Sequence, residues 1–185
     1  MVTPSPLPLR LCVIALFWFE FASAAAAAPY ITLNDEKYFL ADTESNDRQQ
    51  LREYLPKGET LANWERLTSI RITKDLNDPE SFLHRLASQV VHDHPAAKAW
   101  LLQNTQTKAF VLDFMTFPPD KTRPYYAEWN LMRAVYVEGK GLVVYQYASR
   151  LYDVGPQIGP IVVAERNKII GPFSTDTFEE KEDAK

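Results

Sequence analysis

The sequence has few of the residues on which familiar catalytic and disulfide-bonded sites depend. Among 185 residues there are one cysteine, three histidines and six glycines. No glycine-rich phosphate loop is present, and no serine stands in a G-x-S-x-G elbow. The sequence therefore predicts that the protein is not an enzyme, and it indicates no cofactor.

Excess positive charge is also lacking. Twenty Lys and Arg residues face 24 Asp and Glu residues, which gives a net charge of −4. Because nucleic-acid recognition usually needs a basic stripe, this balance argues against a nucleic-acid partner. Beyond the N-terminal segment there is no apolar run long enough to span a bilayer, so no second membrane segment is expected.

Residues 1–27 have the pattern of a secretory signal peptide. Arg10 precedes an apolar stretch that is interrupted by Glu20, and an alanine tract follows it. This pattern predicts cleavage after Ala24 or Ala27 and export to the periplasm or beyond. The alternative is an uncleaved membrane anchor, against which Glu20 weighs because a carboxylate is costly in hydrocarbon. Cleavage would also remove Cys12, leaving neither a disulfide nor a thiol.

The remaining chain predicts one domain over residues 28–174 and an acidic, disordered tail over residues 175–185. Residues 30–33 and 37–40 are short segments that form a small hairpin or an extended arm, and residues 48–54 end at a turn over residues 56–58. Strands are predicted over residues 64–73, 96–103, 108–116, 125–137 and 142–151. The last two strands form a hairpin through the turn at residues 139–141.

Two helices are predicted. Asp78 is a suitable N-cap, and Pro79 and Glu80 suit a first turn. An apolar stripe at helical spacing follows and ends before Pro95. A second helix covers residues 161–170 and ends at Gly171 and the proline that follows it. The resulting fold class is α+β, with a single antiparallel sheet flanked by helices.

A sequence motif leads out of the turn at residues 56–58. From Pro56 to Trp64 the chain reads P-x-G-E-T-x-x-N-W. This segment resembles a pattern in small secreted bacterial proteins of uncharacterised function, whose layout is similar to the PsbP-type α/β/α sandwich. The resemblance implies that fold and carries no catalytic residues. Physically, Pro56 and Gly58 set a turn, and Trp64 either buries its ring or faces a ligand.

The ionisable residues do not form a recognisable metal or catalytic pattern. His92 and His94 lie at the predicted helix end, where the helix dipole favours a cation, and His84 is two turns away. Zinc needs three or four well-placed ligands, so no metal site is predicted. Asp113 and Glu128 lie in neighbouring strands and are either a carboxylate pair or solvent-facing side chains.

Aromatic side chains gather between residues 125 and 152. Alternation places Tyr125 and Trp129 on one strand face, and Tyr126 and Tyr136 on the other. One face belongs to the core, and the other either packs across strands or offers a binding surface that includes arginines. The candidate residues for binding a ligand or partner are Trp64, Tyr126, Trp129, Arg133.

These observations favour an exported, non-enzymatic protein that binds a protein or another component of the envelope. One alternative is a carrier of a small molecule or lipid, which needs a large cavity. A second is a hydrolase, which needs polar groups that converge around Asp113, Glu128 or His92. A third is an inhibitor that presents the proline-rich loop at residues 118–124.

Overall fold

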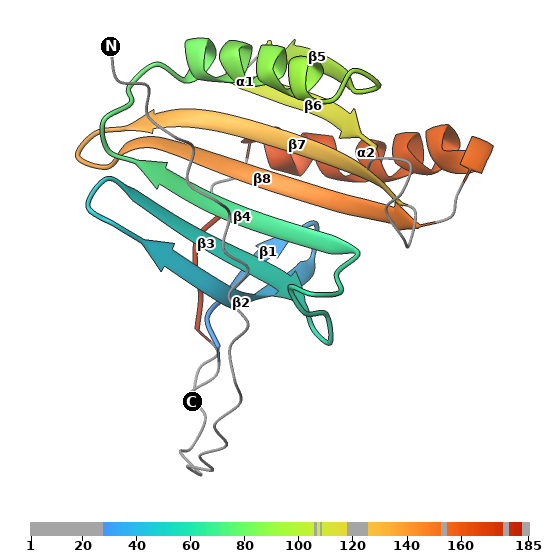
Figure 1. Ribbon diagram of the computed structural model, residues 1–185. Helices are drawn as coiled ribbons and strands as arrows, with labels where there is room; N and C mark the ends of the chain where they lie inside the picture. Colours follow the sequence, from blue (N-terminus) through green and yellow to red (C-terminus); the bar gives the residue numbers. More distant parts are fainter. Residues whose placement is uncertain are drawn as a thin grey trace, which may run out of the picture.

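The computed structural model describes residues 28–105, 107, 109–117, 126–152, 155–175 and 178–182. The predicted signal peptide and the loop at residues 118–124 lie outside the described residues. The described chain forms one antiparallel sheet and two α-helices (Figure 1). The predicted α+β class is confirmed.

Eight strands build the sheet in the order β1-β2-β3-β4-β8-β7-β6-β5. The strands are β1 (Tyr30–Leu33), β2 (Glu36–Ser45), β3 (Gln49–Pro56), β4 (Arg66–Thr73), β5 (Lys98–Gln103), β6 (Phe110–Thr116), β7 (Tyr126–Val137) and β8 (Gly141–Tyr152). The first two segments form a hairpin, and β2 is longer than the sequence indicated. The hairpin predicted between β7 and β8 is confirmed.

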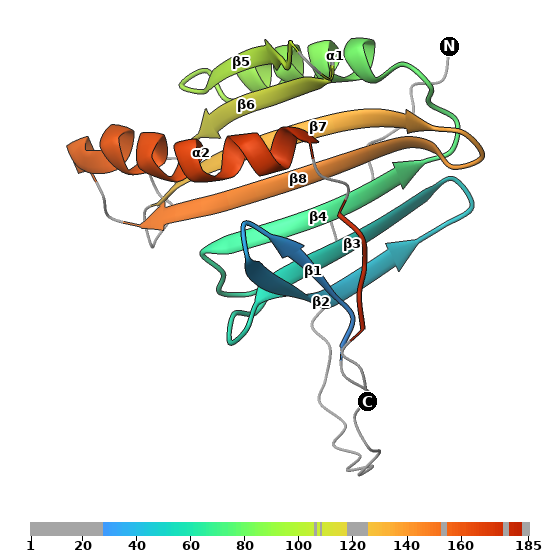
Figure 2. The same cartoon turned by 180° about the vertical axis from the view of Figure 1, so that it is seen from behind.

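The sheet consists of two four-stranded meanders that meet where β4 pairs with β8. Helix α1 (Pro79–Asp93) carries the chain from β4 to β5 at the far edge, and the second meander returns towards the centre. Helix α2 (Ile158–Thr175) follows β8. Figures 1 and 2 show α1 and α2 on opposite faces of the sheet. Each face is named below after its helix.

Alternation along the strands separates two cores. On the α1 face, Leu83 of the helix packs with Leu112, Phe114 and Val144 of the sheet. On the α2 face, Ile31, Trp129 and Tyr147 of the sheet belong to one cluster with α2 residues. This cluster also contains Val162, Ile169 and Phe173. The central strands β7 and β8 are therefore covered on both sides, which explains why nearly all their residues are buried or half-buried.

The start of α1 follows the sequence prediction. Asp78 is the N-cap, and its side chain accepts a hydrogen bond from the backbone N–H of Ser81 at 3.0 Å. The Ser81 hydroxyl donates to the same carboxylate at 2.6 Å. These bonds hold the pKa of Asp78 below its ordinary value of 3.8, because they stabilise the charged form.

Helix α2 is longer than predicted, since it begins at Ile158 and continues through Gly171 and Pro172 to Thr175. Beyond the proline, the Ser174 hydroxyl donates to the carbonyl oxygen of Gly171 at 2.9 Å. Phe173 is fully buried in the α2-face core. Tertiary packing of this last turn outweighs the helix-ending signal of the Gly-Pro pair.

The C-terminal segment also differs from the prediction. Residues 178–182, here called the strap, were expected to lie in a disordered tail. Instead, Phe178 is buried, and the backbone of Lys181 exchanges two hydrogen bonds with Tyr30, at 2.8 and 2.9 Å. In Figure 2 the strap runs from the end of α2 to the start of β1 across the α2 face. The acidic composition of this segment predicts disorder, but the burial of Phe178 fixes it to the α2 face.

Candidate functional site

The motif from Pro56 to Trp64 builds the connection between β3 and β4. Gly58 has φ of +94°, which favours glycine. The carboxylate of Glu59 accepts the backbone N–H groups of Glu65 and Arg66 at 2.7 and 3.0 Å. Thr60 and Asn63 form an isolated bridge inside this loop. The motif thus has a structural role in placing Trp64 at the entrance to β4.

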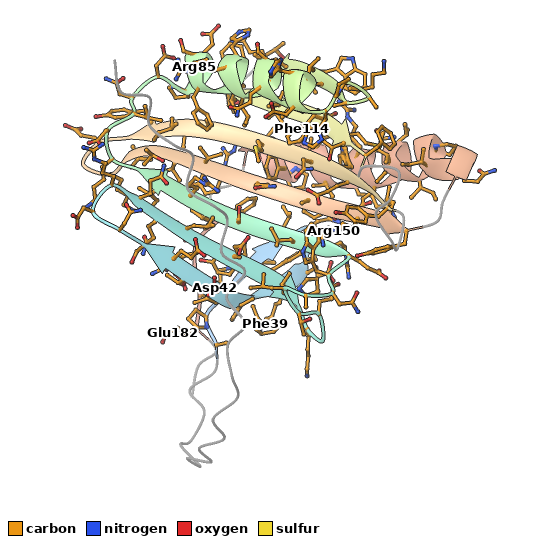
Figure 3. The ribbon with its side chains drawn as sticks, viewed as in Figure 1. Phe39, Asp42, Arg85, Phe114, Arg150 and Glu182 are labelled. Atoms are coloured by element: carbon orange, nitrogen blue, oxygen red, sulfur yellow. The ribbon has the colours of Figure 1, made fainter. Side chains whose placement is uncertain are left out.

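Two of the predicted binding residues come together on the α1 face. The guanidinium carbon of Arg150 lies 3.7 Å from the Trp64 ring centroid and 4.9 Å from that of Tyr126. Glu128 accepts a hydrogen bond from Arg150 Nε at 3.1 Å. Arg150 lies near the end of β8 that is remote from the β7–β8 turn (Figure 3). Arg150 therefore contacts both aromatic rings, and Glu128 neutralises its charge, so these four side chains form one cluster.

The same cluster continues along the sheet as a chain of hydrogen bonds. Asn130 donates to Glu128 at 3.2 Å, Gln146 donates to Asn130 at 2.8 Å, and Ser69 donates to Gln146 at 3.3 Å. A shallow cavity of about 350 Å³ lies beside these residues. Trp64 is only 7% exposed. Because their polar groups already have partners within the fold, these residues have a sufficient structural explanation.

The other two predicted binding residues lie on the α2 face, inside the protein. Trp129 is 1% exposed, and its indole N–H donates to Asp113 at 2.8 Å. Arg166 of α2 donates to the same carboxylate at 2.6 Å. Arg133 is 5% exposed and stacks 4.8 Å from the Tyr145 ring centroid. The structure thus places Trp129 and Arg133 on the face of β7 opposite Tyr126, and because both are buried they form no exposed binding surface.

The carboxylates considered for hydrolysis do not converge. Asp113 pairs across the sheet with Leu131 on the α2 face, whereas Glu128 lies on the α1 face beside Arg150. His92 belongs to the last turn of α1 and is exposed. Each carboxylate is bonded to an arginine. Their arrangement supports packing of the sheet and helix.

A cavity of about 500 Å³ lies on the α2 face between α2 and the β1–β2 hairpin. Tyr38 donates to Glu36 at 3.3 Å, and Tyr147 donates to Glu165 of α2. Burial, followed by the charge of Glu36, raises the pKa of Tyr38. Burial also raises the pKa of Tyr147. Both phenols therefore stay protonated as donors, and their acceptors are already provided by the protein.

The largest of the described cavities lies elsewhere on the α2 face, and we name it the strap groove. Its volume is about 1010 Å³, and it lies between the strap and strands β3, β4, β7 and β8. The floor is apolar and aromatic, and the rim carries basic side chains. Residues of the floor are Tyr54, Ile70, Ile72, Val137, Val143, Tyr145 and Phe178, and basic residues of the rim are Arg48, Arg52, Lys74 and Lys140.

The strap forms one wall of this groove through two contacts. Phe178 packs edge-on against Tyr145, with ring centroids 5.1 Å apart. Glu180 forms an ion pair with Nη1 of Arg52. Glu179 also lines the groove. The wall is therefore acidic and faces the basic side chain of Arg52.

Two buried donors beside the groove have no hydrogen-bond partner among the described residues. They are the hydroxyl of Tyr54 and Nε of Arg52. Both residues line the groove, two positions apart on one face of β3, and Tyr54 is fully buried. Burial raises the pKa of the Tyr54 phenol, and the charge of Arg52 opposes that shift. Because a buried donor without an acceptor is costly, these two atoms are positions beside the groove where a new acceptor would stabilise the protein.

Sequence reasoning did not identify Arg52 and Tyr54. The alternation of β3 places them on one face, which is a detectable signal. Their lack of partners depends on β4, β8 and the strap, none of which is adjacent in sequence. Thr68, the cross-strand neighbour of Tyr54, also has a buried hydroxyl without a partner, but it does not line the groove.

Within the described ranges, neither helix combines the length and apolarity needed to cross a bilayer. In that same part of the chain, no group of three or more His, Cys, Asp or Glu side chains is arranged to hold a metal ion. The residues described here thus point to the strap groove as the candidate site.

Comparisons with known proteins identify a family without assigning an activity. No curated protein and no solved structure matches the chain. A family model matches residues 25–171, which include both helical layers through Gly171 and every strand of the sheet. The strap lies beyond the matched residues. The chain therefore belongs to this protein family, whose function is uncharacterised.

Proposed function

We propose that the protein is an exported, non-enzymatic binding protein whose small-molecule ligand occupies the strap groove. The observation that carries this proposal is an open groove of about 1010 Å³, lined by two residues that each have a buried donor without a hydrogen-bond partner. Ligand sites of this size combine an apolar lining with a few placed polar groups. The strap groove has that composition.

The groove favours a small molecule over a protein partner. Its floor is concave and is lined by strands β3, β4, β7 and β8, with the strap as a wall. A protein interface is usually a broader surface with aromatic anchors at its centre. The aromatic residues first considered as anchors, Trp64 and Trp129, are both buried in the fold. This placement supports the carrier hypothesis.

Export and a PsbP-like sandwich belong to the same proposal. The N-terminal residues 1–27 have the composition of a signal peptide, and a helix on each face of one sheet is compatible with an α/β/α layering. N-terminal sequencing of the protein from the producing cell tests export directly. A start after Ala24 or Ala27 is expected, and an intact Met1 in the membrane fraction would contradict cleavage.

A matched pair of variants tests binding in the groove. Ile72 lies on the groove floor, and its neighbour Arg71 is exposed on the opposite face of β4. Ile72→Trp fills the groove, whereas Arg71→Trp places the same ring outside it. Native mass spectrometry of protein purified from its own host should show a bound mass on the wild type and Arg71→Trp, and none on Ile72→Trp. A bound mass that persists on Ile72→Trp would refute the groove assignment.

A further inference from the structure

We propose that the ligand of the strap groove is a long-chain fatty acid, with its carboxylate at Arg52 and Tyr54 and its acyl chain on the apolar floor. This inference rests on the proposed function, since it names the ligand of the same groove. It follows from the two donors beside the groove, from the apolar floor formed by the strands, and from the carboxylate that already contacts Arg52.

The head-group position is defined by donors that lack acceptors. Arg52 Nε and the Tyr54 hydroxyl are both buried, and neither has a hydrogen-bond partner among the described residues. Arg52 Nη1 is already used by Glu180. A carboxylate presents two oxygens and accepts from the arginine fork and a hydroxyl at once. Both atoms are covered in the ligand-free protein, so the bound carboxylate must displace the contacts that cover them before it accepts from both. A neutral head group satisfies the two donors less well.

The strap itself shows which chemistry Arg52 accepts. The Glu180 carboxylate forms an ion pair with Arg52 at the groove wall. The two side chains are 27% and 35% exposed, so water screens the pair, and its contribution is small. A ligand carboxylate that accepts hydrogen bonds from both Arg52 and Tyr54 has more donors than the Glu180 carboxylate, which pairs with Arg52. Glu180 thus marks the head-group position and competes with the ligand for Arg52.

The floor provides the apolar surface that an acyl chain needs. Cross-strand pairing aligns Arg52 with Ile70, and Ile70 with Tyr145. The next pair along the strands joins Ile72 to Val143. With strands about 4.8 Å apart, the floor extends about 14 Å from β3 to β7. Burying a chain on this surface provides a driving force that grows with each methylene group.

The rim of the groove favours an anion even though the whole protein is acidic. Four basic side chains (Arg48, Arg52, Lys74 and Lys140) and two acidic ones (Glu179 and Glu180) line the groove, so the lining has a positive balance in a chain whose net charge is −4. Arg48 also pairs with Asp75 at 3.5 Å. A local concentration of positive charge attracts an anionic ligand and raises its association rate. An acidic peptide would share this attraction, but it would leave the apolar floor uncovered. The floor therefore decides in favour of the acyl chain.

Calorimetric titration of the purified, delipidated protein with palmitate tests the proposal. Palmitate should bind at one site, and hexadecanol, which has the same chain without the charge, should bind at least about tenfold more weakly. Tyr54→Phe should weaken palmitate binding about tenfold, and Arg52→Gln should weaken it more. Arg71→Gln removes one charge from the opposite face and should leave the affinity unchanged. Glu180→Gln should raise the affinity up to about fivefold.

The outcomes separate this inference from the proposed function. Equal binding of palmitate and hexadecanol, or a Tyr54→Phe affinity equal to that of the wild type, overturns the fatty-acid head-group assignment. Preferential binding of a lysophospholipid or an acidic peptide at the same groove also overturns it. If a bound mass from the host is lost on Ile72→Trp while palmitate does not bind, the groove function stands and the fatty acid is wrong. If palmitate binds Ile72→Trp as it binds the wild type, both fail.

Discussion

Replacement of Tyr54 by phenylalanine should stabilise the ligand-free protein. The Tyr54 side chain is fully buried, and its hydroxyl has no partner among the described residues. In the unfolded chain this hydroxyl is hydrated, so folding strips its water without a compensating hydrogen bond. The cost of such a group is about 1–3 kcal/mol, and the ring remains in place in Tyr54→Phe. We therefore expect the free energy of unfolding in urea to rise by about 1 kcal/mol.

Tyr147→Phe is the matched control, because it removes the same atom from an equally buried ring. Tyr147 is 1% exposed, and its hydroxyl donates to Glu165. Loss of a hydrogen bond to a charged group should lower the free energy of unfolding by about 1.5–3 kcal/mol. The two substitutions therefore shift stability in opposite directions. A loss of more than about 0.5 kcal/mol in ligand-free Tyr54→Phe would show that the hydroxyl has an acceptor, and it would refute the reasoning.

Four further substitutions test the fold and its electrostatics in urea unfolding. Gly141 has φ of +92°, and an added Cβ would lie 2.4 Å from a backbone oxygen, so Gly141→Ala should lower the free energy of unfolding by about 3 kcal/mol. Gly139 has open space around the position of a Cβ, so Gly139→Ala should lower it by only about 1 kcal/mol. Equal losses in the two variants would show that the turn relaxes around the added methyl group. Asp78→Ala should be less stable than the wild type at pH 7. This deficit should shrink as the pH falls below 3.8, because the hydrogen bonds that lower the folded pKa of Asp78 are lost on protonation. Burial, and then neighbouring carboxylates, raise the pKa of Glu53, so ionisation of this side chain lowers the stability of the fold as the pH rises. Glu53→Gln should therefore be more stable than the wild type at pH 7, but not below pH 4.5.

The parts of the fold that depend on local signals could be predicted from the sequence. Asp78 and Pro79 start α1 as expected, and the turn between β7 and β8 closes a hairpin as expected. Such signals act over a few residues, so no knowledge of the tertiary fold is needed. The Gly-Pro pair at the predicted end of α2 is a counterexample, because burial of Phe173 extends that helix.

The candidate site was harder to predict, since alternation alone does not distinguish a surface from a second core. In β7, Trp129 and Tyr126 do lie on opposite faces, yet a helix covers each face of this strand over part of its length. Arg133 consequently lies inside the protein, although the sequence indicates it as a candidate binding residue. The strap groove depends on Phe178 and Glu180. Both residues lie in the segment that is predicted to be disordered because its composition is acidic.

The strap has a consequence for the timing of assembly. Its residues leave the ribosome, or cross a membrane, after all the strands of the sheet. Lys181 must then reach back across the whole domain to bond Tyr30, near the start of the described chain. Until that contact forms, the groove lacks the wall built from Phe178 and Glu180. A chain that stops before the strap would expose more of the apolar floor to water, so residues 178–182 complete the groove after the sheet has formed.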